Sequence, residues 1–185
     1  MKSYYTLVLL VLFFVFGCTK GEPVDSEEFD QLQDTVSLLQ RKLDHYVSMN
    51  MPIAFTAGLS RTIQNMGTKQ IIVFNNVFTN VGNGYNPYSG HFTAPVRGVY
   101  AFFLVITNIP GYSCSVQLLR NGQFIGSLLA HSKENRNFLT STLAVTAKLK
   151  KGDRVWVQNA YGFSPVEKMD GNNWSMFSGH LVGAY

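Results

Sequence analysis

The sequence predicts an all-β domain, either a sandwich or a barrel, preceded by one short helix. After Pro52, short apolar stretches alternate with turns rich in glycine and asparagine, and no helical period is visible. Before Pro52, the apolar residues instead recur at spacings of three and four. The composition, 46% hydrophobic and 14% charged, is typical of a folded globular protein rather than a disordered one.

Residues 1–21 have the features of a secretory signal peptide. Lys2 supplies a positively charged amino end, ten consecutive apolar residues run from Leu7 to Phe16, and small residues follow. The apolar run is well short of the roughly 20 residues that a membrane-spanning helix needs. A membrane anchor or a lipid-modified Cys18 is the alternative interpretation. We therefore expect a secreted, extracellular protein whose mature chain does not span a membrane.

Residues 22–51 are expected to form a short coiled-coil neck. Asp25 can cap the helix, and Met51-Pro52 ends it. The apolar residues are spaced 3, 4, 3, 4 and 3 apart, which is a heptad pattern. These residues are Phe29, Leu32, Val36, Leu39, Leu43 and Tyr46. Because so short a helix is marginal alone, it needs a partner. We favour other copies of the same helix over packing against the following domain.

Residues 52–185 contain the expected strands. GVYAFFLVIT is almost continuously apolar, which is typical of a strand covered on both faces. Asn121-Gly122 lies between two apolar stretches and predicts a tight hairpin. Other apolar or alternating stretches also predict strands. They are IAFTAGL, QIIVFNNVF, CSVQLLR, FLTSTLAVTAKL, RVWVQNAYG and WSMFSGHLVGAY.

Seven residues in this segment follow a specific spacing. They are Phe74, Asn80, Tyr85, Phe92, Gly98, Tyr100 and Phe102. The pattern resembles that of the C1q domain, the globular head of the complement recognition protein, in the C1q/tumour-necrosis-factor superfamily. The family has one more aromatic residue two positions later, where this chain has Leu104. The resemblance covers residues 52–185.

This resemblance implies an all-β jelly-roll sandwich of ten strands in two packed sheets, assembled as a homotrimer. Phe92, Tyr100 and Phe102 would then point inward from adjacent strands, and Gly98 would let the chain turn tightly between them. The seven motif residues would build the fold rather than bind a ligand. A short coiled coil without collagen gives the chain a layout similar to cerebellin-like proteins.

No catalytic motif is present. The chain has no nucleophile elbow, phosphate-binding loop or dinucleotide motif, and its four histidines lack metal-ligand spacing. Cys114 lies in an apolar alternating stretch, which is typical of a buried thiol. We therefore expect no enzymatic activity.

The loop SPVEKMDGNNWS carries two further hypotheses. The residues alone predict no cofactor, but several C1q-family trimers bind calcium through acidic loops. The candidates here are Glu167, Asp170, Asn172 and Asn173, and a solvated turn is the alternative. Asn173-Trp174-Ser175 is also an acceptor sequence for N-glycosylation.

The predicted function is binding. We expect a secreted homotrimer that recognises microbial or altered surfaces, glycans included, in innate immunity. The alternative is a cerebellin-like or cytokine-like ligand for a cell-surface receptor. Without residues 1–21 the chain has thirteen basic and eleven acidic residues, so nucleic acid is not an expected partner. The candidate recognition loops are NVGNGYNPYSG, AHSKENRN and YGFSPVEKMDGNNW.

Overall fold

The computed structural model of the chain describes residues 26–50, 52–132, 134, 137–160 and 167–185. The predicted signal peptide, Asp25, and parts of two candidate loops lie outside these residues. The chain divides into two compact units, Met1–Val47 and Ser48–Tyr185, which are described separately. Across the described residues, no helix has the length and apolar character to cross a membrane.

Helix α2 (Ser26–Asn50) covers most of the predicted neck. Glu27 and Glu28 lie in its first turn, where negative charge interacts favourably with the helix dipole. Of the apolar stripe, Phe29 and Val36 are partly buried, and the other four residues are exposed. An exposed stripe at heptad spacing is the surface that a coiled coil would cover.

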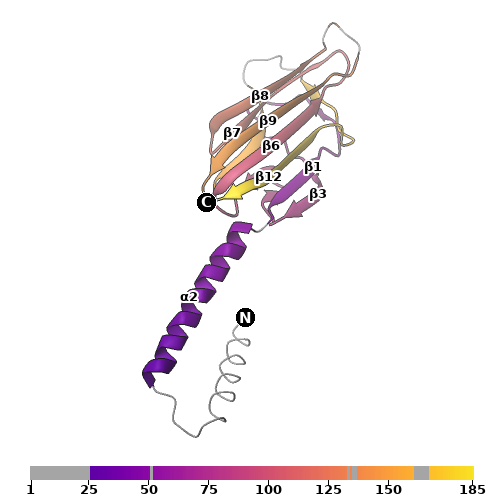
Figure 1. Cartoon of the computed structure of the whole chain (residues 1–185). Helices are drawn as coiled ribbons and strands as arrows, with labels where there is room; N and C mark the ends of the chain where they lie inside the picture. The colour runs from indigo at the N-terminus through magenta and orange to yellow at the C-terminus, as the bar shows by residue number, and fades with distance from the viewer. Residues whose placement is uncertain (1–25, 51, 133, 135–136, 161–166) are drawn as a thin grey trace. The chain divides into compact units, whose positions relative to one another are not determined.

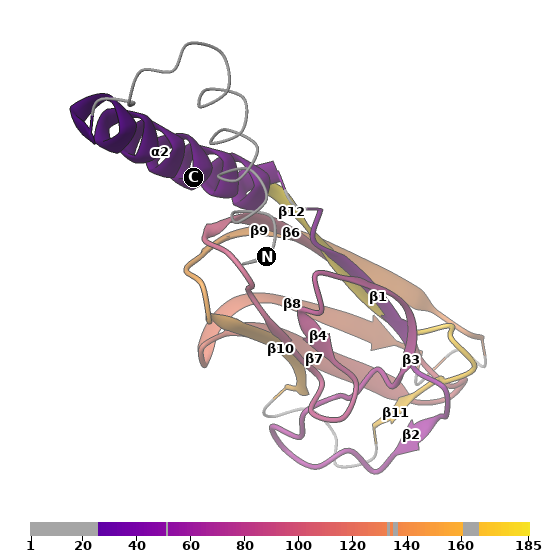
Figure 2. The same cartoon turned by 90° about the horizontal axis from the view of Figure 1, so that it is seen from below.

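Two five-stranded antiparallel sheets form the second unit, and Figure 2 shows them as two layers. The first sheet has the order β3 (Asn76–Val81), β1 (Ala54–Gly58), β12 (Met176–Ala184), β6 (Gly98–Thr107), β9 (Thr140–Leu149). The second has the order β4 (Tyr85–Asn86), β5 (His91–Thr93), β10 (Arg154–Asn159), β7 (Ser113–Arg120), β8 (Gln123–His131). A small third sheet pairs β2 (Ile63–Gln64) with β11 (Lys168–Met169). Most of the first sheet faces the viewer in Figure 1.

Aromatic side chains from both sheets meet in the core. The Phe55 ring of the first sheet stacks on Tyr85 and Phe92 of the second, with ring centroids 4.9 and 5.0 Å apart. Phe177 and Phe102 pack around these rings. Contacts between large flat rings bury much apolar area and fix the spacing of the two layers.

Two expectations about the motif were wrong. Phe92 lies on β5 in the second sheet, whereas Tyr100 and Phe102 lie on β6 in the first. The rings therefore meet across the sandwich, with Phe92 and Phe102 centroids 5.5 Å apart, rather than from adjacent strands. Gly98 is not in a turn either: it is the first residue of β6, paired with Ala184 and Leu149.

The expected strand over QIIVFNNVF was only partly right. Pairing with β1 begins at Asn76. Before that, the chain runs beside β10 of the other sheet, where Ile71 bridges Gln158 and the Ile72 N–H donates to the Val157 carbonyl at 2.9 Å. This segment crosses from one layer to the other, so Ile72 and Phe74 are buried although the segment belongs to no regular ladder.

Strand β6 is not covered on both faces in the described unit. Its even-numbered residues from Tyr100 to Ile106 are buried in the core, while Phe103 on the opposite face is 39% exposed.

The predicted Asn121-Gly122 hairpin is present between β7 and β8. Both turn residues have positive φ, 49° and 84°, as a type I′ turn requires.

Candidate functional site

The seven motif residues have structural partners. The side-chain amide of Asn80 donates to the Tyr85 carbonyl at 2.9 Å, and the Tyr85 N–H donates to Asn80 Oδ1 at 3.0 Å. Asn80 thus closes the loop between β3 and β4. Tyr85, Phe92, Tyr100, Phe102 and Phe74 are buried. Burial also raises the pKa of the Tyr85 hydroxyl well above its ordinary range, against a smaller opposing effect from the Phe74 backbone.

The outer face of the first sheet is almost free of charge. Side chains along a strand alternate between its two faces, and the even-numbered residues of β6 are buried in the core. Ala101 and Phe103 therefore point away from the core. Their cross-strand partners complete two rows over all five strands. The rows are Thr79, Thr56, Ser178, Phe103 and Ala144, and Val81, Ala54, His180, Ala101 and Thr146. We call these ten residues the assembly face.

At the centre of the assembly face, two rings stack. The rings of Phe103 and His180 lie 5.8 Å apart and within 14° of parallel. Val81 is 45% exposed at the edge of the same face. A broad surface of small, apolar and uncharged side chains is typical of a protein–protein contact.

Buried polar side chains hold the loops at one end of the sandwich. The Asn108 side chain accepts from the Leu139 N–H at 2.7 Å and donates to Ser132 Oγ and to the Tyr112 carbonyl. Beside it, the Thr107 N–H donates to Ser175 Oγ at 3.0 Å. Asn108 and Ser175 are fully buried. These bonds replace water for polar groups inside the protein and so fix the loops in place.

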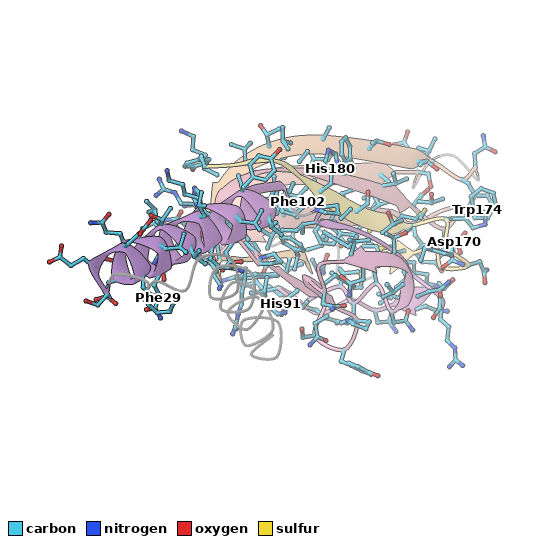
Figure 3. The ribbon with its side chains drawn as sticks, turned by 60° about the horizontal axis from the view of Figure 1, so that its bottom comes forward. Phe29, His91, Phe102, Asp170, Trp174 and His180 are labelled. Carbon is cyan, nitrogen blue, oxygen red and sulfur yellow. The ribbon has the colours of Figure 1, made fainter. Side chains whose placement is uncertain are left out.

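Two exposed aromatic residues stand on these fixed loops. Thr107 Oγ1 donates to the carbonyl of Trp174 at 3.2 Å. Asn108 Oδ1 accepts a hydrogen bond from the N–H of Leu139, the residue after Phe138. Trp174 is 65% exposed and Phe138 is 60% exposed. Figure 3 shows Trp174 at the rim of the domain, close to Asp170. We call the region around Trp174, Phe138 and Leu139 the loop end.

The three candidate recognition loops do not gather at one place. The described parts of AHSKENRN and YGFSPVEKMDGNNW belong to the loop end. NVGNGYNPYSG instead lies around edge strand β4. There Asn86 Oδ1 accepts from the N–H groups of Tyr88 and Ser89, which presents Tyr88 almost fully exposed.

Three of the four calcium candidates make hydrogen bonds within the protein. Asp170 Oδ1 accepts from the Thr62 hydroxyl at 3.1 Å, and Asn173 Oδ1 accepts from the Asn76 amide at 3.0 Å. Glu167 is buried and faces the backbone N–H of Ser115. Among the described residues there is no group of three or more His, Cys, Asp or Glu that could hold a metal ion.

The cysteine at position 114 is a buried thiol without a disulfide. Burial is the main cause that raises the pKa of this thiol above its ordinary range, and the carboxylate of Glu167 adds to it. A thiol that stays protonated is a poor nucleophile. The environment of Cys114 is therefore that of a core residue.

These features match a known family. The sequence profile of the C1q domain matches residues 54–182. The chain belongs to the C1q domain family. Curated relatives of this C1q domain include complement C1q tumor necrosis factor-related protein 3 of Mus musculus, which is 33% identical over 137 residues, or 74% of the chain and 53% of that protein. Multimerin-2 of Mus musculus is 34% identical over 131 residues, or 71% of the chain and 13% of that protein.

Solved structures share the fold of this C1q domain. The globular domain of zebrafish complement 1qA protein has a TM-score of 0.58 at 23% identity and covers 72% of the chain and 99% of that structure. The Eiger tumour necrosis factor of S. frugiperda has a TM-score of 0.60 at 16% identity, covering 74% and 96%. The chain spans about half the length of the C1q-related curated relatives. Members of this family are non-enzymatic, as the sequence predicted.

The sequence reasoning missed the residues that organise the loop end. Thr107 and Asn108 directly follow the apolar stretch GVYAFFLVI, and polar residues at a buried strand end were a signal for loop anchoring. The exposure of Phe138 was also not predicted. Phe138 is the first residue of the stretch FLTSTLAVTAKL, and the alternation of that stretch did not show whether its first side chain is buried or exposed.

Proposed function

We propose that the chain is a secreted, homotrimeric binding protein that recognises surface ligands through its exposed loops. The observation that carries this proposal is the loop end, where Trp174 and Phe138 stand exposed on loops fixed by Thr107 and Asn108. Aromatic side chains held rigidly lose little conformational entropy on binding, so they suit protein and glycan ligands.

Self-association is supported by two separate surfaces. The assembly face offers uncharged residues from five strands around Phe103 and His180. Helix α2 offers an exposed stripe at heptad spacing. A trimer would present each loop end three times, so weak single contacts would add through avidity. Trimeric assembly is also what the C1q resemblance implies.

Recognition of microbial or altered surfaces in innate immunity is the function that we favour. A cerebellin-like or cytokine-like ligand for a cell-surface receptor is the second candidate, and the tumour-necrosis-factor-like neighbours by fold favour it. The two candidates differ in what the loop end contacts, a repeated glycan surface or a single receptor.

The assembly is tested by the mass of the secreted protein in solution, measured by light scattering with and without a chelator. A mass three times that of the subunit supports the proposal, and loss of that mass on chelation would implicate calcium. Phe103→Lys should dissociate the trimer, because it places a charge in the covered face. Phe124→Lys is the matched control, since Phe124 is 59% exposed on the second sheet. A monomeric wild type would overturn the homotrimer.

The binding site is tested with glycan arrays, bacterial cells and cultured mammalian cells. Phe138→Ala and Trp174→Ala should each reduce binding of the trimer at least several-fold, as truncation of an exposed aromatic anchor does. Phe124→Ala should not, although its exposure nearly equals that of Phe138. Equal binding by all three variants would move the site away from the loop end.

A further inference from the structure

Charge is distributed very unevenly along the chain. Residues 48–185 contain eleven Lys and Arg against four Asp and Glu, a formal charge of +7. Residues 22–47 contain two against seven, a formal charge of −5. The near-neutral total therefore hides a strongly basic C1q domain. Such a charge attracts polyanions and speeds their encounter with the protein.

The four acidic residues of the domain offset only part of this charge. Glu167 and Asp170 are buried. Asp153 is partly buried; its carboxylate accepts from the Lys150 N–H at 3.0 Å and from the Asn121 amide of the neighbouring turn at 2.9 Å, and it offsets part of the charge of Arg120 and Lys150. Of the four, only Glu134 is exposed.

Six of the basic residues gather where four strands of the two sheets begin or end. Residue pairing joins the first residue of β6 to the last residue of β9, and β10 begins beside the last residue of β7. Five of the six side chains are exposed, and that of Arg120 is partly buried. They are Arg97, Arg120, Lys148, Lys150, Lys151 and Arg154. We call this cluster the basic end.

Hydrogen bonds join the two turns of the basic end into one rigid unit. The Asn121 N–H donates to the Arg154 carbonyl at 2.9 Å, and the Arg154 N–H donates to Asn121 Oδ1 at 2.8 Å. The Arg120 guanidinium donates to the Lys148 carbonyl at 2.9 Å. The strands that carry the charges therefore hold fixed positions relative to one another.

The turns of the basic end are open to a ligand. A Cβ atom built on Gly122 or Gly152 would meet no other atom within 4 Å. On the adjoining edge, the Arg97 guanidinium lies over the Tyr185 ring, 4.6 Å from its centroid. This cation–π contact holds the Arg97 side chain while leaving it exposed. Fixed positive charges around accessible turns are suited to multiply charged anions.

We propose that the basic end binds a sulfated polysaccharide of the heparan sulfate class. Arginine can bind two oxygens of one sulfate, and lysine supplies a further point charge. The described residues of the cluster include no helix that could enter a DNA groove, and the β7–β8 hairpin belongs to a five-stranded sheet rather than standing out as a free ribbon. Residues 121–122 and 150–153, which form the β7–β8 and β9–β10 turns, include no apolar residue, and Ala94, Pro95 and Val96 before Arg97 are buried or partly buried, so the turns expose little that could insert into a lipid bilayer. A flexible, linear polyanion fits these features best, and an extracellular partner rests on the secretion proposed above.

The test is binding of the full secreted chain to immobilised heparin at several NaCl concentrations. The wild type should bind with a steep salt dependence, because ion release drives such association. Lys150→Gln/Lys151→Gln should bind about tenfold more weakly near 0.15 M salt, since two exposed ion contacts are lost. Desulfated heparin should not bind.

The matched control removes the same number of charges from the other end of the domain. Arg61→Gln/Lys69→Gln alters two exposed basic residues and should retain wild-type affinity. Arg61 lies beside Gly171, and Lys69 precedes Gln70, whose carbonyl accepts from the N–H of Asn159 at the end of β10 opposite Arg154. Equal losses of heparin affinity in both double variants would show that only net charge matters. Unchanged affinity in Lys150→Gln/Lys151→Gln would overturn the site. Tighter binding to duplex DNA or to phosphatidylserine vesicles than to heparin would overturn the class of ligand. Light scattering on every variant separates a lost site from a lost trimer.

Discussion

The hydroxyl group of Tyr85 makes two hydrogen bonds to a single residue, Phe74. Its oxygen accepts from the Phe74 N–H at 3.2 Å, and its O–H donates to the Phe74 carbonyl at 3.0 Å. Both residues are buried, and Phe74 lies in the segment that crosses from the second sheet to the first. One side chain thus replaces the ladder bonds that this part of the backbone lacks.

Tyr85→Phe should therefore destabilise the domain more than loss of one surface hydrogen bond would. The variant leaves a buried N–H and a buried carbonyl without this partner, which costs about 1–3 kcal/mol. The measurement is urea unfolding followed by tryptophan fluorescence. Tyr100→Phe provides a comparison, because Tyr100 Oη donates only to the Val96 carbonyl. An unchanged midpoint for Tyr85→Phe would contradict the structural role.

Alkaline pH should also destabilise the domain. The pKa of Tyr85, of Tyr100 and of Cys114 is raised in the folded state, in each case chiefly by burial. The stabilising contribution of each group is full below its unfolded pKa, about 8.5 for cysteine and about 10 for tyrosine. It is lost as the pH rises from there toward the folded pKa. We expect the free energy of unfolding to fall between pH 8 and 11, and to fall less above pH 10 in Tyr85→Phe.

Gly98→Ala should be destabilising although Gly98 lies in a strand. A Cβ atom there would lie 2.7 Å from the Gly183 carbonyl oxygen and 2.6 Å from Leu181 Cδ1. Overpacking of this kind costs about 1–3 kcal/mol. Gly183→Ala is the control, because a Cβ there would meet nothing within 4 Å. Thermal unfolding of the two variants should differ clearly, and equal melting temperatures would contradict the packing argument.

The acceptor sequence at Asn173 should be unmodified in the secreted protein. Ser175 is fully buried and bonded to Thr107, and Asn173 Oδ1 accepts from Asn76. The Asn173 side chain also packs closely against Gly58, because a Cβ atom built on Gly58 would lie 2.4 Å from Asn173 Oδ1. A glycan attached to the Asn173 amide would have to displace this packing. Peptide mass spectrometry with and without a glycosidase checks this. A fully occupied site would mean that the loop has a different conformation when glycosylated.

Much of the fold could be predicted from short-range patterns. Alternation identified most strands, and Asn121-Gly122 identified a hairpin whose two φ angles are positive. Leu104, which stands where the family has an aromatic residue, is fully buried, so an apolar side chain fills this core position. These features depend on local backbone preference and on side-chain period, both of which are visible in one strand at a time.

Features that depend on which sheet a strand joins could not be predicted in this way. Neither Phe92 nor Tyr100 indicates that the two face each other across the sandwich, because alternation specifies a face but not a partner. The basic end was missed for a different reason. Its residues lie at or next to the ends of β6, β7, β9 and β10, and only the pairing of these strands brings Arg97, Arg120 and Arg154 to one end.

The position of β12 has a consequence for how the domain is made. This last strand lies between β1 and β6 at the centre of the first sheet. While a ribosome is synthesising the chain, β1 and β6 therefore lack the neighbour that joins them until β12 emerges. Pairing of Ala54 with His180 closes a very long loop, which is a slow, non-local step. The domain can thus complete its folding only after β12 has been synthesised, and loss of this strand would leave two unpaired strand edges at the centre of the sheet.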